Sequence, residues 1–223
     1  MNSLADQVAN GISLEDRLRA LNLVRPHERF RSFSERFGWR KGGDESYIAA
    51  ADITVESDQM LVRPVLMKAI VGFGTTNEKI AQMLSNRQIL ESAGVKTSEL
   101  YACEDAVFYE RFLPEEVDPV SYFKRSDPRT VDLIRYAAAL DALGYTQVAR
   151  GEAFFRDLLA DHTGAYVVDF GSDLGPPKPT QQSDIGYQSL ERIAREAGLT
   201  SEQQDTLERR YESVRTSIRK MTK

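Results

Sequence analysis

The segment from Gly151 to Gly171 constrains this chain most, because it gathers carboxylates around one short hairpin. Its last six residues, from Tyr166 on, are typical of a short buried strand that leads Asp169 into a tight glycine turn. Glu152 and Asp157 stand earlier in the same segment. Carboxylate oxygens are the ligands that Mg²⁺ prefers, so the three acids predict a place for a metal ion and a phosphate.

The composition excludes several classes of protein. A chain of 223 residues is long enough for one core or for two small lobes that share a cleft. The net charge of −5 argues against a nucleic-acid partner, which needs a basic face. The single cysteine, Cys103, allows no intrachain disulfide, which favours a reducing compartment, and we interpret it as a packing residue. The sequence contains neither a membrane-length apolar run nor a signal pattern. We therefore expect a soluble, cytoplasmic protein without a membrane partner.

Residues 1–34 are expected to form an N-terminal helical extension. Ser13 is a candidate helix cap, and Leu14, Leu18 and Leu21 follow on one helical face. Such a face indicates either a helix that packs on the rest of the protein or an arm that docks a partner. The pattern leaves both alternatives open.

Residues 35–113 are expected to form a strand-rich region with one helix. The expected elements are strands at 46–56, 61–71 and 106–113 and a helix at 77–93. Pro64 favours an edge or a bulge in the second strand. Lys68 is the only charge in the apolar half of that strand, VLMKAIV. Such a lysine either faces solvent or binds phosphate in a cleft.

Residues 114–223 are expected to be mainly helical. Helices are predicted at 130–143 and 184–197, and a last helix begins with a capping box from Thr200 to Gln203. Pro114 marks a hinge after the strand-rich region. The fold class is therefore α+β, with the acidic hairpin in the helical half.

This order of elements resembles the protein-kinase-like superfamily, above all its small atypical members. These are the aminoglycoside phosphotransferases, the lipopolysaccharide kinases and the Rio-type kinases. The hairpin that runs from Asp157-Leu158-Leu159 to Asp169-Phe170-Gly171 is similar to the family's N-L-L-x-D-x-x-G … D-F-G pattern. The resemblance implies a bilobal fold, with a small β-rich lobe over 35–113 and a helical lobe over 114–223.

Further matches occur in the family's order. The segment Leu90–Val95 resembles the end of the family's first helix, and the apolar strand around Lys68 resembles its phosphate-pairing strand. The resemblance implies ATP and Mg²⁺ as cofactors, with Asp157 and Asp169 as metal ligands. The implied nucleotide-binding residues are Gly42, Gly43 and Ser46 in a glycine-rich turn, Lys68, Glu78 in the helix, and Glu110 and Phe112 in the hinge.

Two departures concern the catalytic loop and the helix. Glu152 stands at the position of the family's catalytic aspartate, and Arg150 replaces the loop histidine. Arg150 either pairs with a substrate or a loop phosphate or faces solvent, and the sequence leaves these alternatives open. The glutamate side chain is one methylene longer than that of aspartate. Misplacement of a catalytic group by about 1 Å can cost on the order of a hundredfold in rate. The helix glutamate that pairs with the lysine is missing near Gln82 and Met83, so that Glu78 is the nearest acid.

Four functions fit these patterns. The first is transfer of the γ-phosphate of ATP to a hydroxyl of a protein or a small molecule. Lys68, Glu152 and Asp169 would then be the catalytic residues. The others are a pseudokinase used as a binding or regulatory module, transfer of AMP on the same fold, and an unrelated α+β protein in which Asp169-Phe170-Gly171 is only a turn.

Overall fold

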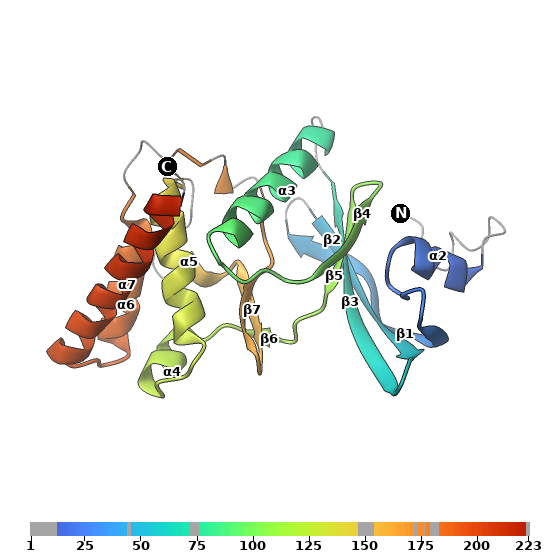
Figure 1. Ribbon diagram of the computed structural model, residues 1–223, viewed down its shortest axis with the longest axis horizontal. Helices are drawn as coiled ribbons and strands as arrows, with labels where there is room; N and C mark the ends of the chain where they lie inside the picture. Colours follow the sequence, from blue (N-terminus) through green and yellow to red (C-terminus); the bar gives the residue numbers. More distant parts are fainter. Residues whose placement is uncertain are drawn as a thin grey trace. The chain divides into compact units, whose positions relative to one another are not determined.

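The computed structural model describes residues 13–43, 46–71, 76–146, 154–171, 174–175, 177–178 and 183–221. The chain has an α+β fold, with a five-stranded antiparallel sheet in its N-terminal half and helices in its C-terminal half (Figure 1). It divides into two compact units. The first unit contains Met1–Asn77 and Ser98–Leu113, and the second contains Glu78–Thr97 and Pro114–Lys223.

The first unit is built on the five-stranded sheet, whose strand order is β1-β2-β3-β5-β4. Every neighbouring pair is antiparallel. The strands are β1 (Arg29–Gly43), β2 (Ser46–Glu56), β3 (Met60–Ile70), β4 (Leu100–Glu104) and β5 (Val107–Arg111). The short helix α2 (Leu14–Ala20) precedes them. The expected strands near residues 46–56, 61–71 and 106–113 are confirmed as β2, β3 and β5.

The strand β1 was not predicted, and its pairing with β2 explains why. The register of the two strands shifts at four places, which include the steps from Phe30 to Ser32 and from Phe37 to Arg40. Each irregularity reverses which side chains face the core, so the sequence lacks the period-2 alternation that identifies a strand. The sequence predicted only a glycine-rich turn at Gly42 and Gly43, where the structure has the end of a long edge strand.

The expectation of an edge or a bulge at Pro64 needs correction. β3 lies inside the sheet, and its register with β2 is continuous from Ser46↔Ile70 to Glu56↔Met60, with Asp52 opposite Pro64. The carbonyl of Pro64 accepts from the Phe112 amide at 3.0 Å. The nitrogen of Pro64 therefore faces the β5 side, where the β5 ladder starts only at the next residue. The missing N–H thus lies at the end of the β3–β5 ladder, opposite Phe112.

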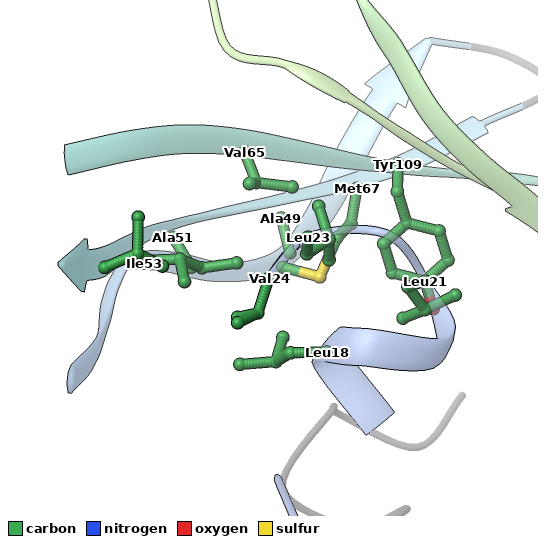
Figure 2. Close-up of a cluster of buried hydrophobic side chains, with 11 residues drawn as sticks. Leu18, Leu21, Leu23, Val24, Ala49, Ala51, Ile53, Val65, Met67 and Tyr109 are labelled. Atoms are coloured by element: carbon green, nitrogen blue, oxygen red, sulfur yellow. The ribbon is translucent and has the colours of Figure 1, made fainter. Parts of the chain in front are cut away.

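One face of this sheet carries the core of the first unit (Figure 2). Leu18 of α2 and the following segment cover the strands. The fully or nearly buried members are Leu18, Leu21, Leu23, Val24, Ala49, Ala51, Ile53, Val55, Val65, Met67 and Tyr109. The helix starts where predicted, because the Ser13 Oγ accepts from the Asp16 amide at 3.1 Å. Its apolar face, for which packing and partner docking were the alternatives, packs on the chain's own sheet.

A buried ion pair fastens the segment after α2 to β3. The Arg63 Nη2 donates to the Glu28 Oε1 at 2.8 Å, and the Arg25 amide donates to the Glu28 Oε2 at 2.7 Å. The Arg63 guanidinium, followed by the Arg25 amide, lowers the pKa of Glu28 to about 2 although burial opposes the shift. Glu28 precedes β1 directly, so residues assigned to an extension belong to the body of the first unit.

The second unit holds the helices after α2 and a three-stranded sheet of order β6-β7-β8. Its elements are α3 (Thr76–Ser92, whose first two residues lie in the first unit), β6 (Glu115–Glu116), α4 (Pro119–Lys124), α5 (Thr130–Leu143), β7 (Leu158–Asp161), β8 (Gly164–Val167), α6 (Ile185–Glu196) and α7 (Ser201–Met221). The predicted helix at 130–143 is confirmed by α5. The capping box is confirmed as well, because the Gln203 amide donates to the Thr200 Oγ1 and the Thr200 amide to the Gln203 Oε1.

The helices α5, α6 and α7 pack together (Figure 1). One carboxylate, that of Asp141, is buried among them. Asp141 of α5 is 1% exposed and accepts four hydrogen bonds. Two of them come from backbone amides in the first turn of α6, at Gly186 and Tyr187. The N-cap residue of α6 makes no side-chain capping bond. The others come from the hydroxyls of Ser183 and Tyr211. Asp141 therefore caps α6 from a neighbouring helix and joins it to α7. None of the described helices has the length and apolarity needed to cross a membrane.

Candidate functional site

Asp157 and Asp169 lie at the open end of the β7–β8 hairpin. Leu158 pairs with Val167, and the amide of Val168 donates to the carbonyl of Asp157 at 2.8 Å, which extends the ladder by one step. Asp169 follows directly, and its Oδ1 accepts from the Gly171 amide at 3.0 Å. Both carboxylates are partly exposed. The hairpin therefore presents two acids at one end with access to solvent.

Tyr136 of α5 connects the two acids to the interior of the second unit. Its side chain is 1% exposed, and its hydroxyl donates to the Asp157 Oδ2 across 3.5 Å. Burial raises the pKa of Tyr136 well above its usual value, and the charges of Asp157 and Asp169 raise it further. The charges of both carboxylates therefore act on this one phenol.

Phe170 anchors the turn that carries Asp169. Its ring is 2% exposed, and the guanidinium carbon of Arg87 lies 5.5 Å from the ring centroid. Arg87 is itself held by α3 and the segment after it, because it donates to Glu91 at 2.9 Å and to Thr97 at 3.0 Å. The position of Asp169 thus depends on contacts with α3.

The third acid of the predicted site, Glu152, lies outside the described residues, as does Arg150. The predicted convergence of three carboxylates therefore stays a prediction. Among the residues that the structure describes, no group of three or more His, Cys, Asp or Glu side chains could hold a metal ion. The pair Asp157 and Asp169 is instead the type of donor set that suits Mg²⁺, which keeps several waters and takes one or two carboxylates together with phosphate oxygens.

In the first unit, Lys68 lies on the face of the sheet opposite the core. Its neighbours Met67 and Ala69 are buried, whereas Lys68 is half-buried, as strand alternation requires. Ile48 and Phe108 flank it on the adjacent strands. This face is thus largely apolar around the lysine.

Glu110 lies on the same face as Lys68, because it pairs with Leu66 two residues away on β3. It is 3% exposed and accepts from the hydroxyl of Ser98 at 2.8 Å. Phe112 follows β5, and its ring lies 6.3 Å from that of Phe37. The sequence-predicted residues Lys68 and Glu110 therefore share one face.

Of the residues predicted in a glycine-rich turn, Gly42 and Gly43 are the last two of β1 and Ser46 is the first of β2. Gly43 pairs with Ser46 across the hairpin, and Ser46 is buried. A Cβ at Gly42 would meet the Cγ2 of Ile48 at 2.7 Å, so the close packing of the two strands favours glycine there. Gly42, Gly43 and Ser46 are thus brought together at one end of the hairpin.

Glu78 lies in the exposed first turn of α3. In the middle of the helix two polar residues are in the interior, where Asn86 is wholly buried and Arg87 is nearly so. Asn86 accepts from the Gln82 amide at 3.0 Å and from the Tyr145 hydroxyl at 3.1 Å. The middle of α3 therefore presents a buried polar face.

Cys103 is half-buried on β4, opposite Phe108. Burial raises the pKa of its thiol, and the charge of Glu110 raises it further. A nucleophilic cysteine needs the opposite shift. Its environment is that of a packing residue.

Sequence reasoning did not identify Tyr136 or Asp141 as important. Both lie on α5, a mainly apolar segment that was predicted as a helix at 130–143. A hydroxyl and a carboxylate within so apolar a helix were the available signal, because buried polar groups need partners. The chain was also compared with known proteins: no family model matches it, and no curated protein matches it.

Proposed function

We propose that this chain is a small kinase-like phosphotransferase that uses ATP and Mg²⁺. The observation that carries the proposal is the placement of Asp157 and Asp169 at one end of the β7–β8 hairpin. The buried Phe170 beside them supports it, because it fixes the turn that presents Asp169.

The residues have separate roles in this proposal. Asp157 and Asp169 would hold Mg²⁺, which neutralises charge on the transferring phosphoryl group when bound. Lys68 would pair with the α- and β-phosphates, and Glu110 and Phe112 would contact the adenine. Glu152 would orient the acceptor hydroxyl and take its proton as the oxygen bonds to the γ-phosphorus and ADP leaves.

Turnover of ATP tests the proposal, with water as the acceptor. ADP release is measured with Mg²⁺ and with EDTA for the wild type and for Asp169→Asn. The amide keeps an acceptor for the Gly171 N–H and removes the charge. We expect Mg²⁺-dependent turnover that falls by about a hundredfold or more in the variant. Asp205→Asn, an exposed site on α7, is the matched control and should behave as the wild type.

Two other results contradict the proposal and identify the alternatives. A wild type that binds nucleotide but releases no more ADP than Asp169→Asn is a pseudokinase. A protein that releases pyrophosphate, with AMP on its product by mass spectrometry, is a nucleotidyl transferase.

A further inference from the structure

A second candidate site lies in the second unit, at the other end of the β7–β8 hairpin. A cavity of about 580 Å³ opens between the end of α3, the start of α5 and the hairpin turn at His162 and Thr163. Asp157 and Asp169 lie at the opposite end of the four-residue strands, roughly 13 Å away at about 3.3 Å per residue. The cavity is therefore separate from the acid pair.

The charged side chains that line the cavity differ in whether they have an ion-pair partner. Its lining includes Lys96, Asp127, Arg129, Asp132, Arg135 and His162. The Lys96 Nζ binds the Asp132 Oδ2 at 2.9 Å, and the Arg129 Nη2 binds the Asp127 Oδ2 at 2.8 Å. Within the described part of the chain, Arg135 makes no ion pair or hydrogen bond. The two carboxylates of the lining thus each form an ion pair with a cation other than Arg135. The Arg135 guanidinium can therefore bind an anion from solution.

The wall around Arg135 is held in place by hydrogen bonds. Lys96 also donates to the Thr163 carbonyl at 3.1 Å, and Asp132 accepts from the Ala165 amide at 3.1 Å. These bonds join the segment after α3, the helix α5 and the hairpin turn. A site whose walls are fixed before binding loses less entropy when a ligand arrives.

Gly94 leaves the space that the Arg135 guanidinium occupies. It ends α3 with a φ of +75°, and a Cβ there would meet the Arg135 Nη1 at 2.7 Å. The guanidinium therefore lies directly against the backbone at Gly94, in a space that a larger residue would fill. Val131 and Pro128 add apolar surface to the same cavity.

We propose that this cavity binds the phosphate group of a small phosphomonoester. Arg135 is its principal cation, because a planar guanidinium can donate two parallel hydrogen bonds to phosphate oxygens. The exposed His162 is a second donor. The volume suits a small organic molecule, whose apolar part lies against Val131 and Pro128. This proposal is independent of the phosphotransferase proposal.

Amide chemical shifts in an NMR titration test the site. The ¹⁵N-labelled full chain is titrated in EDTA with phenyl phosphate and with inorganic phosphate. We expect saturable shifts at Gly94, Arg135 and Thr163 for both probes. Tighter binding of phenyl phosphate identifies an organic phosphomonoester as the source of the phosphate, and equal binding identifies free phosphate. No saturable shift, or shifts outside the cavity, overturns the proposal.

Substitutions then separate this site from a general attraction for anions. Arg135→Gln should weaken binding about tenfold, since a charge-assisted hydrogen bond is lost. His162→Gln lies on an exposed turn and should weaken binding about twofold to threefold without affecting the fold. Arg210→Gln, an exposed site on α7, should bind as the wild type. If Arg135→Gln does not fold, the affinity of His162→Gln alone tests the proposal. Unchanged affinity in the folded variants overturns the proposal.

Discussion

The hydroxyl of Tyr136, in the middle of α5, donates to the Oδ2 of Asp157 at the start of the β7–β8 hairpin. The bond is long, at 3.5 Å, and the phenol that donates it is buried. The interior of the second unit therefore helps to orient one of the two proposed metal ligands.

This contact predicts an energetic coupling between the two residues. The free energy of unfolding is measured in urea for Tyr136→Phe, Asp157→Asn and the double variant. We expect a coupling of about 0.5–1 kcal/mol, because each single change removes the same interaction. Strictly additive effects would show that the hydroxyl and the carboxylate do not interact.

The buried carboxylate of Asp141 predicts a large effect of a small substitution. Tyr211→Phe removes only a hydroxyl, but that hydroxyl donates to Asp141 at 2.6 Å in the interior. We expect a loss of about 2 kcal/mol of unfolding free energy, the usual range for a hydrogen bond to a charged group. Tyr187→Phe on the adjacent, half-buried ring is the control and should cost less than about 0.5 kcal/mol. Equal losses in the two variants would contradict the cap described for Asp141.

Two glycines in the same unit should respond differently to alanine. A Cβ at Gly186 would lie 2.5 Å from the backbone oxygen of Ala137, so Gly186→Ala must push α6 away from α5. We expect a loss of about 2–3 kcal/mol. Gly198 has a φ of +73° and nothing within 4 Å of a Cβ, so Gly198→Ala should cost only about 1 kcal/mol of backbone strain. Calorimetry or urea unfolding of the two variants measures the difference, and a smaller loss for Gly186→Ala would be inconsistent with the close crossing.

The ion pair of Glu28 and Arg63 predicts a pH-dependent contribution to stability. The pKa of Glu28 is lowered to about 2 in the folded chain, against about 4.3 for an unperturbed glutamate. The folded state therefore binds fewer protons than the unfolded state between these values. The stabilisation is complete above about pH 5 and is lost as the pH falls toward 2.

Unfolding of Glu28→Gln and the wild type at several pH values tests this prediction. The wild type should be more stable by about 2–3 kcal/mol at pH 7, and the difference should shrink below about pH 4. Glu99→Gln, at a half-exposed salt bridge with Arg25, is a control with little expected effect. A difference that does not depend on pH would mean that Glu28 is not ionised against Arg63.

The sequence predicted the regular elements well and the polar interior poorly. The helix α5 and the capping box at Thr200 follow from local rules, which a single sequence contains. The strand β1 does not, because its shifted register with β2 hides the alternation. Asp141 is also beyond local rules, since its four donors come from residues 42 to 70 positions away.

The candidate site also contains residues that the sequence predicted and residues that it did not predict. The sequence identified Asp157 and Asp169, and the ladder of β7 and β8 brings them to one end of the hairpin. Their shared neighbour Tyr136 and the contact of Arg87 with Phe170 depend on how α5 and α3 pack within the second unit. Such contacts depend on packing between distant segments, which periodicity and spacing do not specify.

In the proposed function, Asp157 and Asp169 hold one divalent cation together with ATP. Paramagnetic broadening of amide signals by Mn²⁺, added with ATP to the ¹⁵N-labelled chain, tests it most directly. We expect broadening centred on Asp157, Asp169 and Gly171, abolished in the variant that combines Asp157→Asn with Asp169→Asn and retained in Asp205→Asn. Broadening centred elsewhere, or unchanged in the combined variant, would contradict the claim.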